Sequence, residues 1–174
     1  MNLEKADYEV ICLLGNLDDF KKKLEMNGDT IDQIKNQIDE YGTSLLECAL
    51  SSGKFDIAGY LLDNHVELDV IHDEGNEFHD IAYRLEYPGG VEMAYRLLDL
   101  GVSLNIQDKK YKNTGFFTLC HSIFTKKREP EVEFLAECLR RGSVDLDIKN
   151  VIGKTSRDFI NEYGPDRLKE MIKN

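Results

Sequence analysis

The apolar residues of segment 42–69 lie at helical spacing in two short stretches that are separated by Gly53. Each stretch places its apolar residues on a single helix face: Leu46, Ala49 and Leu50 in the first, and Ile57, Ala58, Leu61 and Leu62 in the second. A helix of this length is not stable alone in water. The pattern therefore predicts two short helices that pack on each other and on their neighbours.

The same arrangement recurs along the chain. Segment 75–82 copies segment 42–49, and segment 93–105 copies the second helix and its exit. Further copies begin near Asn113 and Gly153, and segment 10–29 fits a more divergent first copy. We expect one domain of about five stacked units, with approximate boundaries at residues 6–38, 39–71, 72–108, 109–149 and 150–174.

These units resemble the ankyrin repeat, which is a 33-residue β-turn followed by two antiparallel helices. Gly42 and Gly75 are 33 positions apart, and segments 97–105 and 153–156 match the repeat best. The resemblance covers nearly the whole chain. It implies an all-α ankyrin-repeat solenoid of helix-turn-helix units with short β-turn connections.

The Thr-Pro-Leu-His turn of that family is nowhere intact. Ser44, Thr114 and Thr155 keep the hydroxyl that caps the first helix of a unit. The histidine that usually ties neighbouring turns together is expected to be missing, so we expect looser turns and a less regular superhelix.

Two units are longer than the repeat. The extra residues lie around segment 86–90 in the third unit and segment 125–130 in the fourth. Because the apolar pattern stops before each segment and resumes after it, both are predicted to be loops between the two helices of a unit. Such loops either form a functional edge of the stack or are ordinary surface loops whose length and sequence vary at little energetic cost.

The charge of the chain limits its partners. The protein has 174 residues, of which 41% are hydrophobic, and its formal net charge is −11. Residues 1–100 hold 8 basic and 22 acidic side chains, a net charge of −14, whereas residues 101–174 hold 14 and 11, a net charge of +3. Nucleic acid and anionic membrane are therefore disfavoured, since both need a cationic surface. The acidic half is either an ordinary solvated surface or a recognition face for a cationic partner.

The sequence also indicates a compartment. No segment has the apolar length of a membrane span, and the first residues do not resemble a signal peptide. The four cysteines, Cys12, Cys48, Cys120 and Cys138, are far apart and form no C-x-x-C pair. We expect reduced thiols in a cytoplasmic protein.

No residue pattern predicts chemistry. His72 and His79 are seven positions apart with no cysteine between them, which is not a zinc pattern. Segment 153–155 resembles the end of the phosphate-binding loop motif G-x-x-x-x-G-K-T, but Ile148 stands where this motif requires its first glycine. His65 stands where a helix exit usually has glycine. No pair of carboxylates is singled out by its spacing. We therefore expect a protein that is not an enzyme and has no catalytic residue, metal or cofactor.

The resemblance to ankyrin repeats places partner-binding residues at the turn tips and on the exposed face of each first helix. Carried over to this sequence, the candidates are Tyr41, Thr43, Asp73, Glu74, Asn76, Arg84, Tyr111, Asn113 and Tyr163. Tyrosine is a favoured interface anchor because a rigid ring carries a polar end, so Tyr41 and Tyr111 are the strongest candidates. The alternative for Tyr41 is packing against the next turn.

In type, an acidic module of degenerate repeats resembles the small ankyrin immunity proteins found beside secreted bacterial toxins. This resemblance implies an antidote that binds a basic toxin domain, either as a free monomer or in a one-to-one complex. One alternative is an ankyrin adaptor or regulator with a cellular partner. Another is an enzyme whose catalytic residues the sequence does not reveal.

Overall fold

The protein is described by a computed structural model that covers residues 1–126 and 128–173. These residues form eleven helices and no β-strand. Their only β-type pairing is three isolated bridges, Ile38–Ser44, His72–Gly75 and Gln107–Thr114, in the hairpin-shaped loops between helix pairs. The all-α class predicted from the sequence is confirmed.

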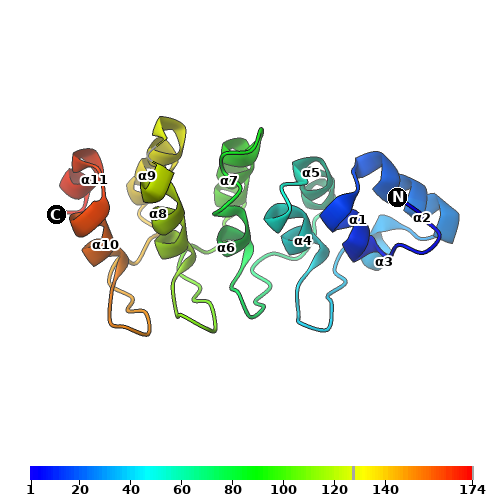
Figure 1. The fold of residues 1–174 in the computed structure, drawn as a ribbon, viewed down its shortest axis with the longest axis horizontal. Coiled ribbons are helices and arrows are strands. Elements are labelled where there is room, and N and C mark those ends of the chain that lie inside the picture. Colours follow the sequence, from blue (N-terminus) through cyan, green and yellow to red (C-terminus); the bar gives the residue numbers. More distant parts are fainter. Residues whose placement is uncertain (127, 174) are drawn as a thin grey trace.

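The helices follow one another in pairs along a single file (Figure 1). Their bounds are α1 Tyr8–Leu14, α2 Leu17–Asn27, α3 Ile31–Ile34, α4 Leu45–Ser51, α5 Phe55–Asp63, α6 Glu77–Ile81, α7 Gly90–Asp99, α8 Gly115–Lys126, α9 Glu129–Arg141, α10 Ser156–Tyr163 and α11 Asp166–Met171. The first helices of the pairs, α1, α4, α6, α8 and α10, contact one another in sequence order. The second helices, α2, α5, α7, α9 and α11, form another row beside them.

Local sequence signals set the helix ends. Ser44 and Thr155 cap α4 and α10, and each forms a reciprocal capping box with the acidic residue three positions later. His65 adopts φ +55° directly after α5, in the left-handed conformation expected at a helix exit. Gly53 takes φ +68° between α4 and α5, so the break predicted there is confirmed.

The core runs along the whole file between the two rows of helices. Leu61 of α5 and Leu97 of α7 are fully buried, and so are Phe78 of α6 and Phe116 of α8. Short helices of this kind derive most of their stability from such packing. Each helix pair therefore depends on its neighbours.

The extra residues of the two long units behave differently. Those of the third unit connect α6 to α7, as predicted. Those of the fourth unit do not form a loop: Thr125 and Lys126 end α8, and Glu129 and Pro130 begin α9. The prediction of a loop is wrong there because the apolar pattern of α8 continues through Phe124 and because proline is favoured in the first helical turn. Lys127 lies outside the described residues.

Neighbouring turns are tied together by hydrogen bonds, contrary to the expectation of a missing histidine. The backbone N–H of Asn76 donates to His79 Nδ1, so Nε2 carries the proton and donates to the backbone oxygen of Asn113 in the next hairpin at 3.0 Å. Backbone bonds from Lys109 to Asp73 and from Val151 to Tyr111 add further ties. The expectation failed because the capping position of this turn holds asparagine, which hid the histidine three residues later.

None of the described helices combines the length and the apolar character that spanning a membrane requires.

Candidate partner-binding groove

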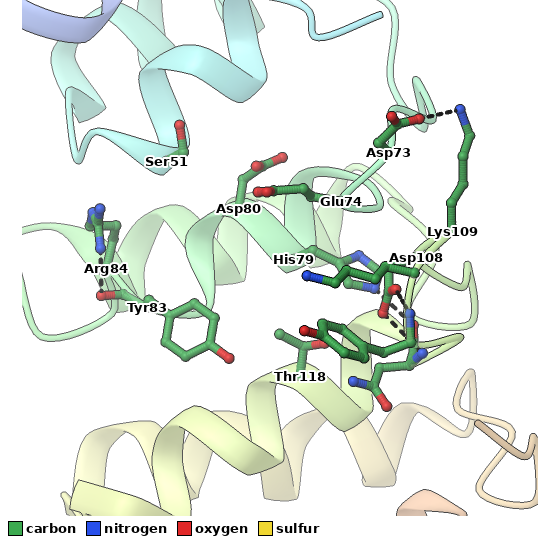
Figure 2. Close-up of a pocket in the computed structure, with 13 residues that line it drawn as sticks. Ser51, Asp73, Glu74, His79, Asp80, Tyr83, Arg84, Asp108, Lys109 and Thr118 are labelled. Carbon is green, nitrogen blue, oxygen red and sulfur yellow. Dashed lines mark hydrogen bonds and ion pairs between the residues drawn. The ribbon is translucent and has the colours of Figure 1, made fainter. Parts of the chain in front are cut away.

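A groove of about 640 Å³ opens beside the first helices of three successive pairs. It is lined by Ser51 at the end of α4, by residues of segment 73–84 and by residues of segment 108–118 (Figure 2). Its volume lies within the range of ordinary ligand-binding clefts. The groove exists only because consecutive pairs are stacked, since each wall comes from a different pair.

Five of the predicted partner-binding residues come together in this groove: Asp73, Glu74, Arg84, Tyr111 and Asn113. The other predicted residues lie elsewhere. Tyr41 and Thr43 are in the hairpin before α4, where Tyr41 is 68% exposed, and Tyr163 at the end of α10 packs partly on Phe159.

Asn76 was predicted to contact a partner, and the structure contradicts this. Its side chain is fully buried, with the amide nitrogen donating to Asp69 Oδ1 at 3.0 Å and to the Ser103 backbone oxygen at 2.9 Å. Asparagine at the start of a helix satisfies backbone groups that would otherwise lack partners. Asn76 therefore holds its hairpin against the next one and does not face solvent.

Most charged groups around the groove already have partners within the protein. Lys109 Nζ lies 2.7 Å from Asp73 Oδ1, and Lys110 Nζ lies 4.8 Å from the centre of the Tyr111 ring. Asp108 accepts backbone N–H bonds with both carboxylate oxygens, from Tyr111 and Asn113. These contacts shape the hairpin of residues 107–114.

Two carboxylates at the groove, Glu74 and Asp80, are not ion-paired with a lysine or arginine of the described chain. Glu74 is exposed and forms no ion pair within the described part of the chain. Asp80 lines the groove, although its side chain is only 6% exposed, and burial raises its pKa. Figure 2 shows both side chains next to each other on the side of the groove that faces Ser51. They form the anionic wall of the groove.

Behind this wall lies a cluster that the sequence analysis did not find. His72 Nε2 is 3.2 Å from Asp80 Oδ2 and 3.6 Å from Glu47 Oε1, and Glu47 is fully buried. Burial raises the pKa of Glu47 to about 7. The Glu74 backbone N–H points at His72 Nδ1, 3.3 Å away, which leaves the imidazole proton on Nε2, between the two carboxylates.

These three side chains are of metal-ligating types, and their ligand atoms all lie within 4.8 Å of one another. The spacing of His72 and His79 along the chain gave no sign of this cluster, because Glu47 is brought to His72 only by the folded chain. With its proton on Nε2, His72 donates to Asp80 Oδ2, whereas Glu47 Oε1 has no hydrogen-bond partner among the described residues. An ion at this place would have to displace that proton. The arrangement shown is a proton-bearing polar cluster that joins α4, α6 and the hairpin of residues 71–76.

A further buried carboxylate lies close by. Glu77 in the first turn of α6 is fully buried, and burial raises its pKa to about 8, with the charge of Glu47 adding to the shift. One of its oxygens accepts a bond from the Asp69 N–H at 2.8 Å, whereas the other, Oε2, has no hydrogen-bond partner among the described residues. The pKa of Glu77 is thus strongly raised by its surroundings, and Glu77 forms no ion pair with a described residue.

The hairpin tips add an apolar surface. They project on one side of the file (Figure 1), and the exposed large apolar residues among them are Ile38, Tyr41, Ile71, Tyr111, Val151 and Ile152. We call these six residues the tip row. Isolated exposed apolar residues are common on proteins, but a repeated set along one edge is typical of a binding surface. Tyr111 belongs both to the tip row and to the groove.

Neither a protein-family model nor a curated protein matches this chain.

Proposed function

We propose that this chain is an ankyrin-type repeat protein that binds another protein through the groove and the tip row and catalyses no reaction. The order of elements supports this proposal: a hairpin, a first helix and a second helix recur along one file, with left-handed glycine or histidine residues at their exits. The spacing of 33 residues between Gly42 and Gly75 agrees with one repeat.

The observation that carries the proposal is the position of Tyr111. Its ring is 52% exposed at a hairpin tip and also lines the groove, so the apolar and polar parts of the surface are continuous. A specific protein interface needs roughly 800 Å² per partner, with aromatic residues enriched at its centre. A groove extended by a row of exposed tips can supply such an area, whereas a small ligand would contact only the groove.

The charge favours a cationic partner. The chain has a net charge of −11, and no lysine or arginine among the described residues is ion-paired with the anionic wall of the groove. Opposite charge accelerates association with a basic domain. We therefore propose that the partner is a basic toxin domain, which the protein neutralises inside the producing cell as an antidote. A regulatory or adaptor role is the second possibility, and the experiment below separates the two.

The test is co-expression with a basic toxin encoded beside this gene. We expect the wild-type protein to restore growth and to form a stable complex. Replacing Tyr41 and Tyr111 by alanine should weaken binding by about tenfold or more, because rigid aromatic anchors dominate interface energies. Met26→Ala is the matched control, since Met26 is 53% exposed on α2, away from the hairpin tips.

Three outcomes are informative. Loss of protection in the tyrosine variant, with protection retained in Met26→Ala, supports the proposal. Protection that does not change in the tyrosine variant contradicts the proposed surface. If the wild type binds a cellular protein by this surface but protects against no toxin, the adaptor role replaces the antidote.

A further inference from the structure

We propose that the anionic wall of the groove receives an arginine side chain of the partner. The receiving site, which we call the arginine notch, consists of Ser51, Glu74, Asp80 and Tyr83. This inference rests on the proposed function, because it names the chemistry by which a basic partner is recognised at the same groove.

The first step is that no lysine or arginine of the described chain is ion-paired with Glu74 or Asp80. Arg84 is one helical turn after Asp80 and could pair with it. Its guanidinium instead lies 5.6 Å from the centre of the Tyr87 ring and donates to the Tyr83 backbone oxygen. Lys109 is held by Asp73. Figure 2 shows Arg84 on the far side of the groove from Glu74. Within the described chain, Glu74 therefore forms no ion pair, and the one ion-pair partner of Asp80 is His72, which does not line the groove.

The second step is the burial of Asp80. A carboxylate that is 94% removed from solvent loses hydration, and a single bond to His72 replaces only part of it. The other oxygen of Asp80 has no hydrogen bond within the described residues, and Asp80 borders the groove. A cation that enters the groove and donates hydrogen bonds to Asp80 would replace the hydration that this carboxylate loses on burial.

The third step is the choice of cation. Tyr83 follows Asp80 by three residues, its side chain is 48% exposed, and Figure 2 shows its ring beside the groove. A planar guanidinium can stack on a tyrosine ring while donating several hydrogen bonds in fixed directions to carboxylates. An ammonium group is a compact point charge without a planar face, so it can lie over a ring, as Lys110 does over Tyr111, but it cannot stack on the ring while donating paired bonds in fixed directions. The combination of two carboxylates and an aromatic face therefore favours arginine over lysine.

The size of the groove sets the form of the partner. Its volume of about 640 Å³ exceeds what one side chain needs, so the notch occupies only part of it. The remaining space beside Thr118 and Tyr111 can hold the adjoining residues of a loop. The occupant is thus a short surface loop of a basic protein with an arginine at its tip.

The experiment is an NMR titration of the full chain with N-acetyl-arginine methylamide. N-acetyl-citrulline methylamide, which has nearly the same shape but no charge, and N-acetyl-lysine methylamide are the comparison probes. We expect shift changes at the amides of Ser51, Asp80 and Tyr83 with the arginine probe, weaker changes with lysine and none with citrulline. Glu74→Gln should weaken arginine binding about threefold or more, and Glu25→Gln, an exposed acid on α2, should not.

The outcomes separate this inference from the proposed function. Equal binding of citrulline, or an unchanged titration in Glu74→Gln whose amide spectrum is otherwise native, overturns the arginine notch. If the arginine probe causes no shifts but Tyr41 and Tyr111 still determine partner binding, the proposed function stands and the notch is wrong. If the probe binds as expected but the two tyrosines do not affect the partner, the notch stands and the proposed surface is wrong.

Discussion

Glu77 allows a direct test of how a buried carboxyl group affects the stability of this fold. It is fully buried at the start of α6, its Oε2 lacks a partner, and its pKa is raised from 4.5 to about 8. The folded protein therefore holds a proton on Glu77 that the unfolded chain has already released between these two pH values. Stability must then fall as the pH rises through this window.

The size of the effect follows from the two pKa values. Each pH unit between them changes the free energy of unfolding by about 1.4 kcal/mol, so the loss is about 3 kcal/mol at pH 7 and about 5 kcal/mol above pH 8. Glu77→Gln keeps an oxygen that can accept from the Asp69 N–H but cannot ionise. We expect the variant to match the wild type within about 1 kcal/mol near pH 5 and to be more stable by about 3 kcal/mol at pH 7.

The assay is urea unfolding followed by far-ultraviolet circular dichroism at unit steps from pH 5 to pH 9. Glu67→Gln is the matched control, because Glu67 is an exposed glutamate in the loop after α5. Its stability should follow that of the wild type at every pH. Parallel curves for Glu77→Gln and the wild type over the whole range would refute the reasoning, because Glu77 would then not retain its proton in the folded state.

Three more predictions follow from the packing. Leu97→Ala removes a fully buried side chain of α7 and should lower the free energy of unfolding, measured by urea titration, by about 2–5 kcal/mol. The control Leu100→Ala, at a residue that is 47% exposed, should change it by less than about 0.5 kcal/mol. His79→Phe should cost about 1–3 kcal/mol in thermal or urea unfolding, because the Asn113 oxygen loses its donor, and an unchanged midpoint would show that the tie between the hairpins is unimportant. Deleting residues 150–174 should expose apolar residues of α8 such as Phe117, which packs on Phe159, and cause association in light scattering; a truncated chain that stays monomeric with the expected helicity would contradict this.

The periodic part of the fold could be predicted because each helix carries its own signal. Apolar spacing, Gly53 and the capping residues Ser44 and Thr155 are local, so they indicate helix existence and ends without knowledge of the partners. Tyr111 and Glu74 were expected at hairpin tips from the resemblance to ankyrin repeats, and the structure brings both to the groove.

The parts that failed depend on contacts between units. Glu47 is 25 residues from His72, and the two meet only because neighbouring helix pairs stack. Asn76 looks like an exposed polar residue at a tip, but it is buried, and its side-chain amide donates to Asp69 in its own loop and to Ser103 in the loop after α7. No local pattern encodes such burial, since it results from how close two successive hairpins lie.

The contacts along the file of helix pairs also determine how the protein unfolds locally. Among the described helices, the main contacts of each first helix are with the second helix of its own pair and with the first helices directly before and after it. Fraying can therefore begin at either terminus and stop part-way, leaving the interior folded. A ligand that touches Ser51, Asp80 and Tyr111 at once would clamp three consecutive pairs together. Bound protein should then resist proteases in its middle third far better than at its ends.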